Sequence, residues 1–419
     1  MVAMVGVTRT SNRSQSACVD RFGEEESFSL EGEFDWSLRE QQLVMGSYYW
    51  GYTIAMIPAA WVATRVGFRL AFGLAMAGGA VTTLLFPTMA KVSVMLALVA
   101  RVILGSLHAV AFPAMTGAWG AWAPPQEKTG LNGIAVSGAS LGTLAIFTLA
   151  GLVADSLGWE AVFYITGALN MLWVLVWFLL VADTPGQHRL ISPEERDFIQ
   201  GSIGQGEEQM DRRRLVTPWR AILTSVPVWG IVLGHTASNW GNYTLNQQLP
   251  TYLSNVLRYS LSFNGVLSSV CYLMQTLGIF CESFFFTFFY SNFVSVCLIM
   301  TRVTDVIISM KLIQTLTIRK LNTFIGLWVS GACAVLAVAA GCQAELAVIL
   351  FALAAGLNVL TVPGCKTGAL DIAPQHAGIV FGLSNTVANI PGFAGPAVVG
   401  ALLTDYSATS QWYYVFCLG

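Results

Sequence analysis

Charged residues are scarce in this chain. Asp, Glu, Lys and Arg together make up 11% of its 419 residues, whereas soluble globular domains contain about 25%. Hydrophobic residues make up 55% of the sequence. This composition argues against a soluble fold, and it indicates an integral, multi-pass membrane protein embedded in the lipid bilayer.

Patterns that would mark other functions are also missing. The eight cysteines form no CxxC or Cys/His spacing, so we expect no metal site and interpret them as small packing residues. A net charge of -2 and the lack of a basic stripe with interleaved aromatic residues argue against a nucleic-acid partner. No HExxH motif and no paired aspartates occur in the apolar segments, so we expect neither an enzyme nor a bound cofactor.

Apolar runs of membrane-spanning length recur along the chain. They are centred near residues 53, 78, 103, 142, 171, 240, 333, 354 and 390, and another apolar stretch covers 265–300. A continuous helix over 265–300 would be about 54 Å long, so we expect one crossing with an irregular or re-entrant excess. The prediction is an all-α polytopic membrane protein with about ten complete crossings.

Basic loop residues are divided unequally between the two sides of the membrane. After the first apolar run, alternating crossings place only Lys91 and Arg258 on one side. The other side collects fourteen: Arg65, Arg69, Lys128, Arg189, Arg196, Arg212, Arg213, Arg214, Arg220, Arg302, Lys311, Arg319, Lys320 and Lys366. Because cytoplasmic loops carry the excess of Lys and Arg, the second side is predicted to be cytosolic.

A long polar loop divides the chain into halves. The expected organisation is a polar, acidic N-terminal tail over 1–42, an N-terminal transmembrane half over 43–182, a cytosolic central loop over 183–227 and a C-terminal transmembrane half over 228–419. Because the tail is polar, we expect no signal peptide in it. The same alternation places it outside with four arginines and no helix to carry it across, so we expect an element to be missing before residue 43.

The two halves resemble each other at an offset of about 250 residues, as parallel repeats in transporters do. "APPQEKTGLNGIAVSGASLG" at 123 corresponds to "APQHAGIVFGLSNTVANIPG" at 373, and "GLVADSLGWEAVFY" at 151 to "GALLTDYSATSQWYYVF" at 400. Glycine-rich membrane helices look alike by composition, but the order of Ala-Pro, Asp and Trp is kept in both copies. Two pseudo-symmetric halves predict a midplane site reached by alternating access.

An arginine lies inside the apolar segment "VSVMLALVARVILGSLHAVAFPAM", residues 92–115. At the centre of a membrane helix an arginine costs about 2.5 to 3.5 kcal/mol, so it needs a use. His108 follows Arg101 after seven residues, on the same helical face two turns away. Pairing of Arg101 with helix carbonyls, and a packing role for His108, are the structural alternatives.

The sequence as a whole resembles the major facilitator superfamily, and within it the anion:cation symporter family of sialin, the vesicular glutamate transporters and the sodium/phosphate cotransporters. The resemblance is carried by "GSYYWGYTIAMIP", "FPAMTGAWGAWAPP", "GWEAVFYITG", "ADTPGQHRLISPEE", "NYTLNQQLPTYL" and "LDIAPQHAGIVFGLSNT", and it extends over most of residues 35–418. It implies the major facilitator fold and a small anionic solute, carried by a monomer through the plasma membrane or a lysosomal or vesicular membrane.

The resemblance also implies a function, secondary active transport of small organic or inorganic anions in symport with H+ or Na+. It implies that Arg101 is the counter-charge for the anion, and it aligns His108 with the position where the family has a coupling glutamate. Histidine also titrates near neutral pH, so His108 remains a candidate for proton coupling.

Polar residues of other segments are further candidates for substrate binding. Asn239, Asn242, Tyr243 and Asn246 recur at helical spacing, where they could bind a solute or hold helices together. The resemblance adds Ser384, Asn385 and Thr386 from the family's eleventh helix, and Ser140 from its fifth helix, which the repeat also supports. Tyr52 of the first apolar run is a further candidate. His235 and Glu282 match no family site and are assigned no role.

The chain departs from the family in three places. Its first apolar run matches the family's second helix, it stops at Gly419 where the twelfth should begin, and the phenylalanine-rich stretch 278–300 is an atypical insert. The alternative function is therefore that of a truncated, transport-inactive splice form or gene-model product.

Overall fold

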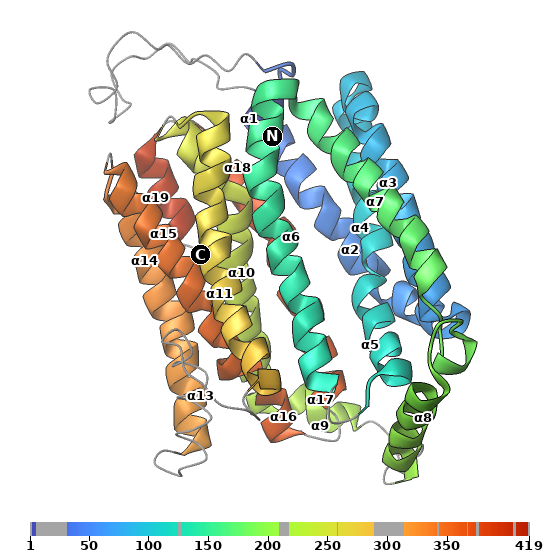
Figure 1. The fold of residues 1–419 in the computed structure, drawn as a ribbon. Helices are drawn as coiled ribbons and strands as arrows, with labels where there is room; N and C mark the ends of the chain where they lie inside the picture. Colours follow the sequence, from blue (N-terminus) through green and yellow to red (C-terminus); the bar gives the residue numbers. More distant parts are fainter. Residues whose placement is uncertain are drawn as a thin grey trace. The chain divides into compact units, whose positions relative to one another are not determined.

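The computed structural model describes residues 2–5, 32–124, 128–208, 218–257, 259–288, 314–341, 343–366, 368–373, 377–404 and 408–417. Every regular element within these ranges is a helix (Figure 1). This agrees with the predicted all-α fold. It is also expected for a chain with so few charged residues, because such a chain lies in a bilayer. In a bilayer, only a helix or a closed barrel satisfies the backbone hydrogen bonds.

The chain divides into two compact units. The first consists of Ser47–Ala135 and Glu160–Thr217, and we call it the N-terminal unit. The second consists of Met1–Gly46, Val136–Trp159 and Pro218–Gly419, and we call it the C-terminal unit. The long helices α2 and α6 each contribute residues to both units.

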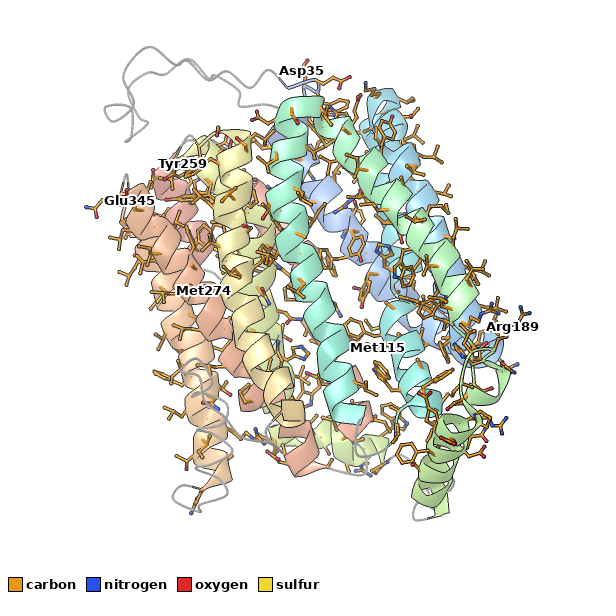
Figure 2. The ribbon with its side chains drawn as sticks, viewed as in Figure 1. Asp35, Met115, Arg189, Tyr259, Met274 and Glu345 are labelled. Atoms are coloured by element: carbon orange, nitrogen blue, oxygen red, sulfur yellow. The ribbon has the colours of Figure 1, made fainter. Side chains whose placement is uncertain are left out.

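The N-terminal unit contains the helices that follow the polar tail and those on either side of α6. They are α2 (Leu38–Val66), α3 (Phe68–Val92), α4 (Val94–His108), α5 (Ala111–Trp122), α7 (Trp159–Leu180), the short 3-10 helix η2 (Pro185–Gln187) and α8 (Pro193–Glu208). In Figure 2, Met115 lies on α5, and Arg189 lies in the connection between α7 and α8.

Local side-chain caps set where several of these helices begin. At the start of α2, the Ser37 hydroxyl accepts the Glu40 backbone N–H at 3.3 Å, and the Glu40 carboxylate accepts the Ser37 backbone N–H at 2.8 Å. This reciprocal arrangement is a capping box. Ser93 and Ser192 accept backbone N–H groups in the same way at the starts of α4 and α8.

The turn between α2 and α3 depends on a glycine and a distant carboxylate. Gly67 has a φ of 92°, which favours glycine. The Asp183 carboxylate, which follows α7, accepts the Arg69 backbone N–H at 2.8 Å and so caps α3. A Cβ on Gly67 would come within 2.8 Å of the same carboxylate. The Arg69 guanidinium donates to the Phe178 carbonyl at 2.6 Å, which fixes the end of α7 beside this turn.

The C-terminal unit contains the remaining helices. They are α1 (Val2–Val5), α6 (Lys128–Leu157), α9 (Trp219–Thr224), α10 (Val226–Asn255), α11 (Leu261–Phe288), α13 (Thr315–Phe324), η5 (Ile325–Val329), α14 (Ser330–Ala339), α15 (Ala344–Asn358), η6 (Val359–Thr361), η7 (Val362–Lys366), α16 (Gly368–Ile372), α17 (Ala377–Ala388), α18 (Pro391–Leu402) and α19 (Thr409–Cys417). Figure 2 shows Tyr259 and Glu345 near one end of this unit and Met274 farther along α11.

Aromatic side chains form the centre of the apolar core in this unit. The Tyr252 ring packs edge-on against Phe351 and Trp412, with ring centroids 5.6 and 5.5 Å apart. Phe416 completes the group at 5.1 Å from Phe351. These four residues come from α10, α15 and α19, so the core connects segments that are far apart in the sequence.

Five described segments are long and apolar enough to cross a membrane: Phe68–Val92, Val94–Trp122, Trp159–Leu180, Leu316–Ala339 and Ala344–Lys366. The predicted crossings centred near 53, 142 and 240 also fall within long helices, namely α2, α6 and α10. The predicted crossing centred near 390 is covered by α17 and α18 together, with a local break between them at residues 389 and 390. The first part of the stretch 278–300 continues α11 to Phe288, and its remainder lies outside the described residues.

Candidate functional site

Arg101 is the central residue of α4, and His108 is the last. The rest of this helix, "VMLALVARVILGSLH", carries no other ionisable group. The predicted spacing therefore holds in a single helix, which places the guanidinium and the imidazole on one side of it. Both residues are partly buried.

Tyr48 of α2 contacts both of these residues. Its ring centroid lies 5.5 Å from the Cζ atom of Arg101, a cation–π arrangement. Its hydroxyl oxygen lies 3.2 Å from Nδ1 of His108, within hydrogen-bond distance. The N-terminal unit thus holds a cation, a titratable ring and a phenol in one cluster. We call Tyr48, Arg101 and His108 the arginine cluster.

Two glycines let α2 and α4 approach closely enough to form the arginine cluster. A Cβ on Gly105 would collide with the backbone carbonyl of Tyr48, and one on Gly51 would collide with the carbonyl of Val102. Small residues at such crossings allow membrane helices to pack backbone to backbone. Gly105 lies between Arg101 and His108 in the sequence. The close approach of the Tyr48 backbone to Gly105 therefore brings the Tyr48 side chain into contact with both residues.

The predicted candidate Tyr52 is buried next to the arginine cluster. It lies one turn after Tyr48, and the two rings stack with centroids 6.1 Å apart. Tyr49 packs edge-on against Tyr48 at 5.2 Å. The structure therefore places Tyr52 and Tyr49 against Tyr48, the residue that contacts Arg101 and His108.

The C-terminal unit holds a different set of polar contacts, between α10 and the broken pair α17–α18. His235 of α10, which we assigned no role from sequence, lies 2.9 Å through its Nδ1 from the hydroxyl of Ser384. Both residues are buried. The His235 ring also stacks against Phe381, with centroids 5.7 Å apart. The predicted candidate Ser384 is therefore placed against another side chain of its own unit.

The break between α17 and α18 receives most of the other contacts. Pro391 begins α18, and the amides and hydroxyls of α10 are positioned at the carbonyls and side chains around it. Asn239 donates to the Ala388 carbonyl at 3.0 Å, and Tyr243 donates to the Asn389 side chain at 2.9 Å. Gln247 donates to the Gly392 carbonyl at 3.2 Å. We call these α10 residues, with His235, the amide seam.

Asn246 and Asn242 face a neighbouring side of α10. They line a small pocket together with Leu245, Leu249, Cys271, Tyr272 and Ala355. The four polar residues predicted to share one face of this helix are thus divided, because Asn239 and Tyr243 contact the α17–α18 break while Asn242 and Asn246 border the pocket.

The remaining candidates lie on α17 and α6. Thr386 donates its hydroxyl to the Gly382 carbonyl one turn earlier at 2.9 Å, and Asn385 accepts the Asn389 side-chain amide at its backbone carbonyl at 2.8 Å. Ser140 lies within α6, and its side chain is outside the described residues, as is that of Glu282.

One pentapeptide of α6 has the GxSxG spacing of a hydrolase nucleophile. Residues 138–142 read "GASLG". That motif functions at a sharp turn from a strand into a helix. Here it lies in the interior of the continuous helix Lys128–Leu157, so it does not form a nucleophile elbow.

The sequence prediction missed Tyr48, His235, Gln247 and Asn389. A signal was present for the α10 residues, since His235, Asn239, Tyr243 and Gln247 recur every four residues. Tyr48 precedes Tyr52 by the same interval. Its spacing alone resembles ordinary aromatic packing, and only the crossing at Gly105 shows which side chains it meets.

Comparison with known proteins gives consistent relatives. A model of the Major Facilitator Superfamily matches residues 27–396. Sialin of Homo sapiens is 34% identical over 385 residues, which cover 92% of this chain and 73% of sialin. Vesicular glutamate transporter 3 of Danio rerio is 30% identical over 387 residues, covering 92% of this chain and 62% of that protein.

Solved structures show the same fold. A bacterial homologue of the human lysosomal transporter Spinster, in an inward-facing and unoccupied conformation, aligns with a TM-score of 0.61 at 16% identity, covering 88% of this chain and 75% of that one. A D-xylose–proton symporter aligns with a TM-score of 0.60 at 13% identity, covering 92% and 87%. At these identities the likeness concerns the fold alone.

Proposed function

Because the chain belongs to the major facilitator superfamily, and within it to the family of sialin and the vesicular glutamate transporters, we propose that it is a secondary active transporter of small organic or inorganic anions. It is a multi-pass membrane protein and a member of a transporter family. The proposal adds the substrate class, symport with H+ or Na+, alternating access between the two halves, and action as a monomer.

The observation that carries this proposal is the position of Arg101. A guanidinium in the middle of an apolar helix needs a partner that offsets the cost of removing it from water. In the arginine cluster, the π face of Tyr48 packs on this guanidinium, and His108 lies on the same face of α4. An anion with a carboxylate or phosphate group is a fitting ligand for this position, because the planar guanidinium can bind either group through two parallel hydrogen bonds.

His108 supplies the candidate for coupling. It ends α4 seven residues after Arg101, and histidine is the side chain whose ordinary pKa lies nearest neutral pH. A proton gained at His108 adds positive charge beside the anion site, so proton uptake and anion binding favour each other. The plasma membrane and the membrane of an acidic vesicle or lysosome both maintain a gradient that such coupling could use.

Reconstitution tests the proposal. The purified protein would be inserted into liposomes and supplied with labelled glutamate, sialate, phosphate, urate or nucleotide, under an inward pH gradient in one arm and an inward Na+ gradient in the other. We expect gradient-driven accumulation of at least one anion and none of labelled glucose. Accumulation of glucose, or no anion uptake by protein that elutes as one folded species, would contradict the proposal.

A further inference from the structure

Tyr48 is in contact with both the cation and the titratable ring of the arginine cluster. Its ring packs on the guanidinium of Arg101, while its hydroxyl lies 3.2 Å from Nδ1 of His108. We propose that Tyr48 is the residue that links proton uptake at His108 to anion binding at Arg101, by redirecting its hydroxyl hydrogen. This inference rests on the proposed function and names the side chain through which its coupling acts.

The link follows from the donor and acceptor roles of the two groups. A neutral His108 that carries its hydrogen on Nε2 leaves Nδ1 as an acceptor, and the Tyr48 hydroxyl donates to it. A proton from a hydronium ion in the aqueous phase then adds to Nδ1. The imidazolium now donates from Nδ1 to the phenol oxygen, because both of its nitrogens are donors.

The phenol hydrogen is thereby released for another acceptor. The Tyr48 O–H bond stays intact throughout, and a single proton moves from water to His108 and returns to water when the cycle reverses. The released hydroxyl can donate to an anion held at Arg101, since the same phenol ring packs on that guanidinium. Protonated His108 therefore adds one hydrogen bond to the bound anion, and by linkage the anion favours the protonated state.

The surrounding helices hold this arrangement in place. The crossing at Gly51 and Gly105 fixes the backbone of α2 against α4 at the level of Tyr48. On the far side of His108, Gly79 of α3 leaves room for Nε2, because a Cβ there would lie 2.9 Å from this atom. The imidazole is thus confined between Gly79 and the Tyr48 hydroxyl.

Few other groups near His108 change charge. Its own helix contributes Arg101, and α2 contributes Tyr48, Tyr49 and Tyr52, none of which titrates between pH 5 and 8 in its ordinary state. The ionisable residues of α3 are at its two ends, where Arg69 bonds to the Phe178 carbonyl and Lys91 pairs with Glu160. The segment Ala111–Trp122 contains no titratable residue. His108 is therefore the member of this group whose ordinary pKa lies between pH 5 and 8.

The test is the variant Tyr48→Phe, which keeps the ring on Arg101 and removes the hydroxyl. Anion uptake into liposomes would be measured from pH 5.5 to 7.5. In the unmodified protein, KM should be lower at acidic pH. In Tyr48→Phe, we expect KM at pH 5.5 to rise by about 5-fold, the equivalent of one ordinary hydrogen bond, and to depend less on pH than in the unmodified protein. The control Tyr164→Phe removes a hydroxyl from an exposed position on α7 and should behave as the unmodified protein.

Two further variants keep the inference falsifiable. Gly79→Ala should press the imidazole towards the Tyr48 hydroxyl, because the added Cβ would lie 2.9 Å from Nε2, and should therefore alter the pH dependence while Arg101 and Tyr48 stay intact. The double variant Tyr48→Phe/His108→Gln should raise KM no further than the single changes do, because both changes remove the same interaction between Tyr48 and His108. An unaltered pH dependence of KM in folded Tyr48→Phe or Gly79→Ala would overturn the inference and leave the proposed function standing. Lack of anion uptake by the unmodified protein would overturn both.

Discussion

The arginine cluster and the amide seam are both polar groups among apolar helices, yet their partners differ. In the arginine cluster, a guanidinium and an imidazole meet the ring and hydroxyl of Tyr48. In the amide seam, neutral side chains of α10 meet backbone carbonyls and an asparagine at the break between α17 and α18.

The difference indicates two roles. Pro391 and Pro396 have no backbone N–H, so carbonyls near them need other donors inside the protein. Asn239 and Gln247 donate to the Ala388 and Gly392 carbonyls, so the amide seam stabilises this part of α17 and α18. The arginine cluster instead combines a cation with a titratable ring and a phenol, so we expect it to bind a charged solute. Substitutions in the arginine cluster should change anion binding, and substitutions in the amide seam should change stability.

The largest effect is expected from Gly105→Ala. The added Cβ would collide with the Tyr48 carbonyl, and overpacking of this kind costs about 1 to 3 kcal/mol. The yield of monodisperse protein and its melting temperature should both fall, and anion uptake should fall with them. Gly120→Ala on α5 is the matched control, because a Cβ at Gly120 has no atom within 4 Å. Equal melting temperatures for the two variants would show that the α2–α4 crossing is looser than described.

A smaller effect is expected from His108→Glu. The carboxylate places a group with a lower intrinsic pKa beside Arg101, so coupling should continue over a different pH range. The pH optimum of anion uptake should shift towards acidic values, with the maximal rate lowered but not removed. An unchanged pH optimum would mean that His108 is not the coupling residue.

The smallest effect is expected from Tyr243→Phe in the amide seam. Loss of the hydrogen bond to Asn389 should destabilise the protein by about 1 kcal/mol and leave the KM for the anion unchanged. Thermal unfolding and uptake would be compared with Tyr414→Phe, an exposed change on α19. A several-fold rise in KM for Tyr243→Phe alone would remove the distinction between the two regions, because it would place Tyr243 at the substrate.

The sequence predicted the helical fold and the relation of Arg101 to His108 because each depends on a single segment. Apolar length in a bilayer requires a helix, and a separation of seven residues on one helix defines a shared face. The contacts of Tyr48 and His235 depend instead on how two helices cross, and periodicity within either helix does not specify this. For a related reason, hydropathy predicted the crossing near 390 but not the local break before Pro391. Hydropathy does not register an interruption in the hydrogen bonding of a helix.

The most direct test of the account compares Arg101→Lys with Arg101→Gln in the liposome assay, normalised to protein that passes size exclusion as a single species. If Arg101 is the counter-charge, Arg101→Lys should retain part of the anion uptake, because the positive charge survives without the planar two-pronged geometry. Arg101→Gln should abolish uptake while the amount of folded protein stays similar. Normal anion uptake by well-folded Arg101→Gln would contradict the account and leave Arg101 with a packing role alone.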